Sequence, residues 1–454
     1  VRQRLVFAGI KLKETKAFCS FHARIYPGCL AIANTEGVVI GAVDGVRKLH
    51  IQHVPLKEMP RRLCYYAEKE MLGVLTIRTE PNPRDAMDLE DQFVESRREE
   101  RSYFHLLDAV TFDVLDQFQM RESELVETIA TVSFASLHGQ TYFVVGTGFT
   151  YDGDMYEELT DGRLLVFAVE DAKRLVLKAE HRVPGGVFQV VSFNGLLLAC
   201  ISNRTACLRC SIRGDFVAVG DLLRSVVLLR YQSEQRQFDV LAQDYTTHWT
   251  CSVTMLNDDT ILAADSCYNL YTLKYHSDDP NEARREVLED VGRFHLGDQI
   301  NRFYPDMADP PAVQLFGTVA GMIGVIVPLT MEQYMLLDQL SFNLNQLRSM
   351  PGDIEHSAWR AYHDERMEKE AMGFIDGDLV EQFLQLPAEE QVAVVEGKIA
   401  AVPRHRHPMY HSRIAAMASD EDSLLSDDEP GGVRPLEASL AEVTALLEEL
   451  ARWH

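Results

Sequence analysis

The stretch GDFVAVGDLLRSVVLLRY, residues 214–231, contains the pattern that decides the fold of this chain. An apolar strand ends on the small turn Val219-Gly220-Asp221, and a second apolar run begins at residues 226–229. Three other stretches end one strand and start another in the same way. They are Val144-Val145-Gly146-Thr147, Ala263-Ala264-Asp265 and Phe316-Gly317-Thr318, which are followed by apolar runs at residues 164–167, 270–271 and 322–327.

Gly220, Ala264 and Gly317 mark successive copies of this pattern, at intervals close to the ~40–50 residues of a four-stranded propeller blade. We therefore predict a mainly β protein. An all-β propeller of about seven blades is expected over residues 1–350, followed by a small α-helical domain over residues 351–454. Further strands are expected at residues 30–33, 38–43, 49–54 and 72–77. Dense charge and two prolines at residues 79–101 predict a solvated insertion between strands.

One predicted blade is shorter than the others. A strand is expected at residues 196–201, and the next recognisable strand begins at residue 215. Residues 202–214, which lie between them, are too few for the hairpin that an intact blade would have. Either a hairpin has been lost here or the gene model omits an exon, and the sequence leaves both explanations open.

The spacing of apolar residues changes to that of a helix in the C-terminal part of the chain. The residues that follow helical spacing are Met331, Tyr334, Leu337, Leu340, Leu344 and Leu347. Asp376 is predicted to cap a helix over residues 379–386, and Pro387 fits the first turn of a helix over residues 388–395. A final amphipathic helix is predicted to open at Pro435.

Residues 403–435 combine a basic, His-rich patch with an acidic low-complexity run, so we predict that they are disordered. His405, His407 and His411 are interpreted as solvated side chains rather than metal ligands. Ser423 and Ser426 lie beside acidic residues, as in substrates of acid-directed kinases, but a solubilising linker is the favoured interpretation.

The composition restricts the partners of this chain. Its 454 residues carry a net charge of −25 at pH 7, and such a surface repels phosphate backbones. We therefore expect contact with DNA only indirectly, through a partner protein. No apolar stretch of about 18 residues and no signal-peptide core are found, so no membrane contact is expected. The eight scattered cysteines are typical of reduced thiols in the cytosol or nucleus.

No catalytic constellation emerges, because the patterns GxSxG, HExxH and GxxxxGK[ST] are absent. Cys207-Leu208-Arg209-Cys210 is a lone CxxC, and zinc usually needs four ligands, so structural thiols are favoured. Asp152-Gly153-Asp154 and Asp376-Gly377-Asp378 are interpreted as turn and cap residues. We predict a non-enzymatic protein with no catalytic residue, cofactor or metal. The alternative is an enzyme whose site lies in the propeller channel.

Five strings of the chain are similar to a known family. They are VVIGAVDGVRKLHIQHVPLKEMPRRLCY (38–65), GDFVAVGDLLRSVVLLRY (214–231), VQLFGTVAGMIGVI (313–326), IEHSAWRAYHDER (354–366) and GFIDGDLVEQFL (373–384). They resemble the third propeller and the C-terminal domain of the damaged-DNA-binding protein 1 family. That family also holds the large cleavage-polyadenylation subunit and a splicing-factor 3b subunit.

The resemblance implies a scaffold or adaptor of cullin-4-type RING ubiquitin ligases, linked to DNA damage recognition and nucleotide excision repair. It implies a location in the nucleus and also in the cytoplasm. In such proteins the first and third propellers receive helical segments of substrate receptors, which are mostly WD40 proteins. The second propeller binds the cullin and has no counterpart in this chain. The alternative within the same family is a subunit of a splicing or mRNA 3′-end-processing complex.

The resemblance also implies partner-binding residues. It places Trp249 on the receptor-facing surface, where an exposed Trp suits a helix-in-groove contact, and the alternative is a Trp packed between blades. Leu222 and Arg224 lie in a turn between two strands, where receptor contact is again implied. The alternative for these two is a hairpin turn with a solvated Arg. The family has an Arg just upstream of the Trp, and Gln243 stands in that place here.

Overall fold

The part of the chain that the computed structural model describes forms two compact units. The described residues are 17–21, 29–33, 38–42, 54–81, 98–137, 139–149, 159, 161–170, 173–202, 207–221, 225–305, 313–347, 355–364, 366–399 and 433–451. The units comprise Val1–His53 with Leu440–His454, and Val54–Ser439. The predicted domain boundary after residue 350 stays a prediction, and most of the predicted disordered segment, residues 403–432, lies outside the described residues.

The first unit contains a three-stranded antiparallel sheet and a helix. Its elements are β1 (Ala17–Phe21), β2 (Cys29–Ala33), β3 (Val38–Ala42) and α7 (Leu440–Leu450). Strands β2 and β3 confirm two of the predicted strands, whereas residues 49–53 of the third lie outside the described residues. On α7, Val443 and Leu447 are fully buried.

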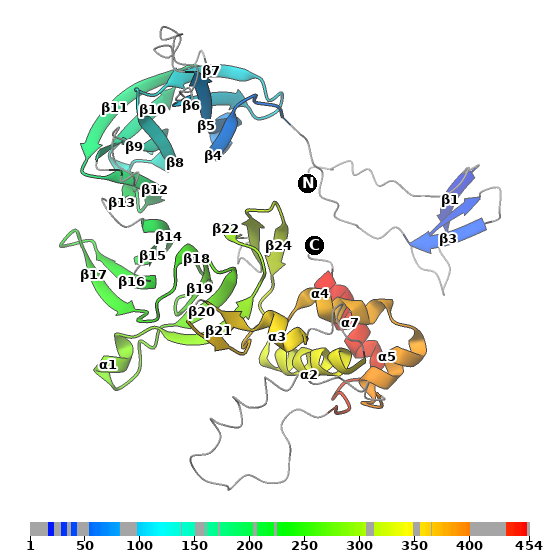
Figure 1. The fold of residues 1–454 in the computed structure, drawn as a ribbon. Coiled ribbons are helices and arrows are strands. Elements are labelled where there is room, and N and C mark those ends of the chain that lie inside the picture. The colour runs from blue at the N-terminus through cyan, green and yellow to red at the C-terminus, as the bar shows by residue number, and fades with distance from the viewer. Residues whose placement is uncertain are drawn as a thin grey trace, which may run out of the picture. The chain divides into compact units, whose positions relative to one another are not determined.

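The second unit contains a β-propeller arrangement, as Figure 1 shows. Four of its antiparallel sheets have four strands and one has three, so the described residues show five blades. The first blade contains β4 (Met59–Tyr66), β5 (Met71–Pro81), β6 (Arg98–Asp108) and β7 (Val114–Gln119), and the second contains β8 (Glu124–Ser133), β9 (Thr141–Phe149), β10 (Asp161–Val169) and β11 (Leu175–Val183). The third contains β14 (Cys207–Arg213), β15 (Phe216–Asp221), β16 (Ser225–Gln232) and β17 (Gln237–Gln243), and the fourth contains β18 (Thr250–Met255), β19 (Thr260–Asp265), β20 (Asn269–Lys274) and β21 (Glu289–His295). The fifth contains β22 (Ile300–Pro305), β23 (Gln314–Thr318) and β24 (Ile323–Ile326). The mainly β propeller is thus confirmed, and the count of about seven blades stays a prediction.

A two-stranded sheet follows the second blade. Its strands are β12 (Gly186–Phe193) and β13 (Leu196–Ser202), and this is where the sequence predicted a shortened blade. The prediction that the next strand begins at residue 215 is wrong, because β14 occupies residues 207–213. A β-bulge between Cys207 and Arg209 interrupts the alternation of β14, which explains why its sequence pattern was not recognised.

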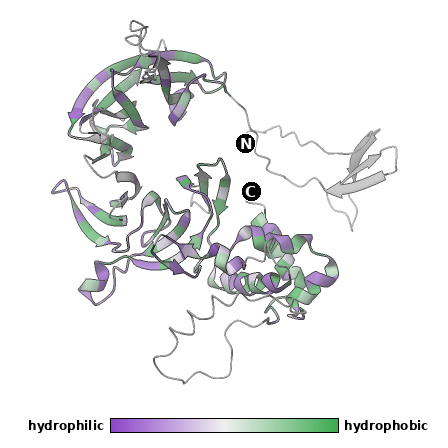
Figure 2. Ribbon diagram, viewed as in Figure 1, coloured by the Kyte–Doolittle hydropathy of each residue, from purple (hydrophilic) through white to green (hydrophobic). Residues whose placement is uncertain are grey.

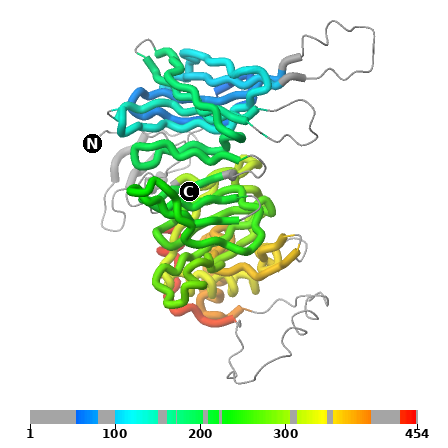
Figure 3. The backbone as a smooth tube through the Cα atoms, turned by 90° about the vertical axis from the view of Figure 1, so that its left-hand side faces the viewer, coloured from blue at the N-terminus to red at the C-terminus, as the bar shows by residue number. Residues whose placement is uncertain are grey.

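The repeated strand-turn-strand pattern is confirmed in four blades. In each case the quoted stretch and the apolar run after it lie on the second and third strands, which pair with each other. One detail differs, because β9 continues beyond Thr147 as far as Phe149, which pairs with both Glu124 and Asp161. Figure 3 shows these sheets following one another along the chain.

The predicted insertion at residues 79–101 begins later and ends earlier than expected. Strands β5 and β6 extend into it, and their last described pair joins Pro81 to Arg98. The charged residues at both ends of the predicted insertion therefore belong to the paired strands β5 and β6. Backbone hydrogen bonds stabilise these strand ends, although few of their side chains are apolar. The rest of the insertion lies outside the described residues.

Short helices and a small hairpin complete the second unit. They are η1 (Ala67–Lys69), η2 (Ala135–Leu137), α1 (Glu282–Arg285), α2 (Met331–Leu347), α3 (His356–Arg360), β25 (Tyr362–His363), β26 (Glu368–Lys369), α4 (Gly377–Glu381), η3 (Gln382–Gln385) and α5 (Ala388–Val395). Helix α2 confirms the predicted helical spacing. Figure 2 shows hydrophobic and hydrophilic residues on both the blade strands and the helices. Across the described residues, every helix is too short or too polar to span a membrane.

The predicted final helix is confirmed, but its predicted start is wrong, because it begins at Leu440 rather than at Pro435. Before the helix, the chain is held in a non-helical conformation by contacts from distant residues. The backbone N–H of Leu436 donates to the carbonyl of Val395 at 2.8 Å, and the buried Asn343 amide donates to the carbonyl of Arg434 at 2.9 Å. These bonds fix residues 434–436 along the end of α5, which prevents a helix from starting there.

The largest apolar core joins the first and second blades. Phe104 of β6, Phe143 of β9 and Phe167 of β10 are fully buried, and their rings pack edge to face. The Phe104 centroid lies 5.5 Å from that of Phe143 and 5.2 Å from that of Phe167. Because these rings come from two blades, their packing resists separation of the blades.

Phe104→Ala should lower the free energy of unfolding by about 3–5 kcal/mol, since it removes a fully buried ring and leaves a cavity between blades. Guanidinium denaturation followed by circular dichroism would measure this. Phe238→Ala is the matched control, because Phe238 is 38% exposed, and it should cost much less. Equal effects of the two substitutions would contradict the assignment of this core.

Candidate partner-binding surface

One face of the propeller collects two kinds of loop. The first kind enters the first strand of a blade, and the second joins the second strand to the third. Because successive strands of a blade are antiparallel, both kinds lie at the same end of the blade. In the last two blades these loops are residues 244–249, 266–268, 296–299 and 319–322. We call these four segments the loop face.

Backbone hydrogen bonds connect the segments of the loop face. The donor–acceptor pairs are Ser266 N to Trp249 O, Leu296 N to Tyr268 O, and Val319 N to Gln299 O, each 2.9 Å long. Each bond joins a loop that enters a first strand to a loop between second and third strands. The four segments therefore form one continuous surface rather than independent loops.

Large apolar side chains are exposed on the loop face. They are Tyr245 (69% exposed), Trp249 (52%), Tyr268 (47%), Val319 (65%) and Met322 (43%). A packed position between blades, the alternative interpretation of Trp249, does not agree with this exposure. Its role in partner binding stays a prediction. Clustered exposed aromatic residues of this kind are typical of interaction surfaces.

Leu222 and Arg224, the other predicted contact residues, lie outside the described residues. The residues on either side of them, Asp221 and Ser225, pair with each other at the end of the β15–β16 hairpin. This connection joins a second strand to a third, so by topology it belongs to the same end of its blade. Gln243, which replaces the family's Arg, ends β17, and its backbone exchanges hydrogen bonds with Glu286 and Leu288.

A buried carboxylate fixes the start of the loop that carries Tyr245 and Trp249. Asp244 is 3% exposed and follows β17 directly. The Ser225 hydroxyl donates to its Oδ2 at 2.5 Å, and the backbone N–H of Thr246 donates to its Oδ1 at 2.9 Å. The Asp244 N–H donates in turn to the carbonyl of Val226 at 2.9 Å. Asp244 thus closes an Asx turn and ties it to the neighbouring hairpin.

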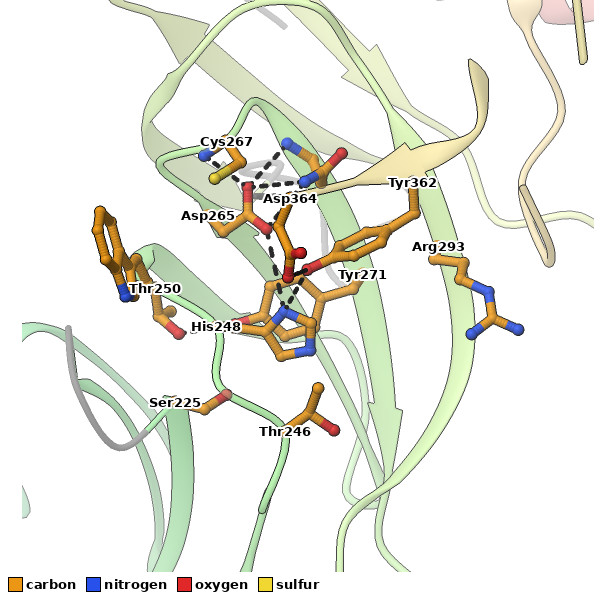
Figure 4. A network of polar contacts seen from close by, with 12 residues as sticks. Ser225, Thr246, His248, Thr250, Asp265, Cys267, Tyr271, Arg293, Tyr362 and Asp364 are labelled. Carbon is orange, nitrogen blue, oxygen red and sulfur yellow. Dashed lines mark hydrogen bonds and ion pairs between the residues drawn. The ribbon is translucent and has the colours of Figure 1, made fainter. Parts of the chain in front are cut away.

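A buried histidine fixes the end of the same loop (Figure 4). The His248 ring stacks on Tyr271, with centroids 4.1 Å apart and planes at 17°. Its Nδ1 lies 3.0 Å from the Tyr362 hydroxyl, and the Thr250 hydroxyl lies 2.7 Å from the Tyr271 hydroxyl. Burial raises the pKa values of both tyrosines, so both hydroxyls stay protonated at neutral pH.

A second buried carboxylate fixes the loop that carries Tyr268. Asp265, which is 2% exposed, accepts at Oδ1 from the backbone N–H groups of Cys267 and Asn269 at 2.9 and 3.0 Å. The Asn269 amide also donates to this carboxylate and to the carbonyl of His363 at 2.9 Å. Asp265 therefore links the loop face to the hairpin β25–β26, far away in the sequence.

The segment from α3 to α4 packs on the same blade. Arg360 donates through Nε to Asp376 Oδ2 at 2.7 Å, and through Nη1 to the carbonyls of His295 and Leu296 at 3.2 and 3.1 Å. His356 Nε2 also lies 2.8 Å from Asp376 Oδ2. Burial alone would raise the pKa of Asp376, but the hydrogen bonds and charges of His356 and Arg360 outweigh it and lower that pKa.

The predicted capping role of Asp376 is therefore wrong. Asp376 does occupy the N-cap position of α4, but its side chain makes no hydrogen bond to the helix. Its carboxylate is instead engaged by His356 and Arg360, and the charged guanidinium of Arg360 binds it more strongly than a neutral backbone N–H would. The sequence could not reveal this competition, because Arg360 lies on a different helix.

Sequence reasoning also missed the buried network under the loop face. One signal was available, because Asp221 and Asp265 both end a strand before a tight turn, where Asp often closes an Asx turn. The contact between His248 and Tyr362 had no such signal, since the two residues are 114 positions apart.

In the described parts of the candidate metal motifs, the side chains do not form a set of metal ligands. Within the described ranges, no group of three or more His, Cys, Asp or Glu side chains is placed to hold a metal ion. Cys210 of the CxxC is buried beside Phe193 and Val217 in an apolar cluster. His405, His407, His411 and Asp152-Gly153-Asp154 lie outside the described residues.

Comparison with known proteins identifies the family. A family described as "CPSF A subunit region" matches residues 101–209 and 201–385 of this chain. The chain belongs to this family. Curated relatives include "DNA damage-binding protein 1b" of Arabidopsis thaliana, 33% identical over 430 residues, and "DNA damage-binding protein 1" of Oryza sativa subsp. japonica, 34% identical over 430 residues.

The match to these two relatives covers 87% of this chain but only 38% of each relative's length. The resemblance to the damaged-DNA-binding branch is thereby confirmed. The alternative of a splicing or 3′-end-processing subunit is not favoured, since both relatives are named for DNA damage.

His295 should make the stability of the second unit depend on pH. Burial, followed by the charges of His363 and Arg360, lowers its pKa to about 4, whereas an unfolded His has a pKa of about 6.5. Between these values the unfolded chain binds more protons, so stability should fall as the pH drops from 6.5 toward 4. Denaturant unfolding at pH 7 and pH 5 would measure it. His295→Gln should lose part of this dependence, and an unchanged pH profile would contradict the assignment.

Proposed function

We propose that this chain is the receptor-binding part of a non-enzymatic adaptor, and that the loop face binds a helical segment of a partner protein. One observation carries the proposal: Tyr245, Trp249 and Tyr268 are exposed on neighbouring loops whose backbones are fixed by buried carboxylates. Aromatic anchors supply most of the binding energy in many interfaces. Loops that are already ordered lose little entropy when they bind.

The chemistry of the surface favours an amphipathic helix with basic flanks. Apolar residues three and four positions apart on such a helix present one apolar stripe, which matches a surface of separate aromatic and aliphatic side chains. The net charge of −25 attracts basic residues beside that stripe. A WD40-type substrate receptor with such a helical segment is the partner that we propose, in agreement with the family resemblance.

The names of the relatives support a place in the DNA damage response. We propose that the adaptor belongs to a cullin-4-type RING ubiquitin ligase in the nucleus and cytoplasm, and that DNA is reached only through the partner. Since the chain spans 38% of its relatives' length, contact with the cullin is assigned to regions that this chain does not share with them. We further propose about seven blades, with residues 351–454 as a helical domain.

Trp249→Ala should weaken the binding of the helical partner segment at least about 30-fold, which corresponds to about 2 kcal/mol for one anchor residue. Fluorescence anisotropy with a labelled helical peptide from a WD40-type receptor would measure the Kd. Circular dichroism should show an unchanged fold, because the Trp249 side chain is half-exposed.

Tyr65→Ala is the matched control for this experiment. Tyr65 is 49% exposed, similar to Trp249, but it lies at the far end of β4, away from the loop that enters that strand. Its removal should leave the Kd unchanged. The proposal fails if Trp249→Ala and Tyr65→Ala give the same Kd. Co-purification with splicing or cleavage factors instead of a cullin would contradict the proposed assembly.

A further inference from the structure

The first strand of every propeller sheet in the second unit contains a β-bulge near its start. The pairing with the second strand shifts within the first three pairs: after the first pair in β14, β18 and β22, after the second in β4 and β12, and after the third in β8. The extra residues are Arg61, Glu127, Phe188, Leu208, Cys251 and Asn301. Bulges bend a strand and redirect its side chains, and they recur beside functional sites. A bulge repeated six times in the described residues is a feature of the architecture.

The residue directly after the bulge holds an equivalent position in all six strands. These residues are Arg62, Thr128, Gln189, Arg209, Ser252 and Arg302. All six are polar, and three are arginines. First strands contact the first strands of neighbouring sheets, from β4 through β8, β12, β14 and β18 to β22. Equivalent positions on them therefore lie at one level along the propeller axis.

Hydrogen bonds show that these side chains reach across to the next first strand. Arg62 Nε donates to the carbonyl of Glu127 at 3.0 Å, and the Gln189 amide donates to the carbonyl of Cys210 at 3.1 Å. The Thr128 hydroxyl accepts from the backbone N–H of Val190 at 3.3 Å. The bulge thus directs Arg62, Thr128 and Gln189 toward the neighbouring first strand, and Arg209 and Arg302 hold the equivalent position on β14 and β22.

The three arginines act on one another electrostatically. Burial, followed by the positive charges of Arg62 and Arg302, lowers the pKa of Arg209 to about 10. Arg62 has a lowered pKa because of burial, and Arg302 contributes to it. The neighbouring carboxyl, Glu127, has its pKa raised by burial, so its ability to compensate the positive charge is reduced. Like charges are held together here although the whole chain carries a net charge of −25.

We propose that Arg62, Arg209 and Arg302, here called the arginine ring, bind a compact oxyanion of the phosphate class at the inner side of the blades. Guanidinium groups bind phosphate oxygens through paired N–H donors, and several of them around one anion suit a multiply charged ligand. Bound phosphate would also relieve the repulsion among the three arginines.

Isothermal titration calorimetry of the full chain with sodium tripolyphosphate tests this proposal. Saturable binding of one tripolyphosphate per chain is expected, and its affinity should fall with added salt. Arg209→Gln and Arg302→Gln should each weaken binding at least about tenfold, since each removes a charged donor. Arg209→Lys, which keeps the charge, should lose less than Arg209→Gln.

Arg213→Gln is the matched control, because Arg213 lies on the same strand β14 but is exposed and pairs with Asp258 at 2.6 Å. It should bind tripolyphosphate like the unchanged protein. Without anion, Arg209→Gln should unfold at the same or a higher temperature, because it removes repulsion. The proposal is overturned if tripolyphosphate gives no saturable heat, or if Arg213→Gln loses as much affinity as Arg209→Gln. It is also overturned if a peptide of the acidic run, residues 419–429, binds the chain and tripolyphosphate does not.

Discussion

The loop face depends on two aspartates that are buried where strands end. Asp244 and Asp265 are 3% and 2% exposed, and each accepts backbone N–H groups from the loop that follows it. A buried carboxylate without such partners would be costly, so each loop conformation is coupled to the satisfaction of a charge. The loops that carry Tyr245, Trp249 and Tyr268 are ordered for this reason.

Asp265 and His248 connect the propeller to the chain that follows it. Asp265 reaches the hairpin β25–β26 through Asn269, and His248 reaches Tyr362 of the same hairpin. Arg360 adds bonds to the carbonyls of His295 and Leu296, beside the third loop of the face. The segment after α2 therefore holds the backbone of the loop face in place through these hydrogen bonds. Local order of this kind is what a partner helix needs in a preformed site.

Local features were predictable from the sequence, and features set by distant residues were not. The β19–β20 hairpin follows from Ala263-Ala264-Asp265 and the apolar run after it, and α2 follows from its own periodicity. Strand β14 was missed because its bulge breaks the alternation. Asp376 was misassigned as a cap because Arg360 competes for it, and the start of α7 was misplaced because Val395 holds Leu436. Trp249 was predicted as a partner contact through the resemblance, and this stays a prediction, whereas its exposure depends on how neighbouring blades pack.

Hydrogen–deuterium exchange of the amides at residues 244–250, read by mass spectrometry, tests the central claim most directly. If the buried carboxylates order this loop, these amides exchange nearly as slowly as those of the flanking strands β17 and β18, and Asp244→Ala makes them fast while the core of the second blade stays protected. Rapid exchange at residues 244–250 in the unchanged protein, at the rate of a solvated loop, would contradict it.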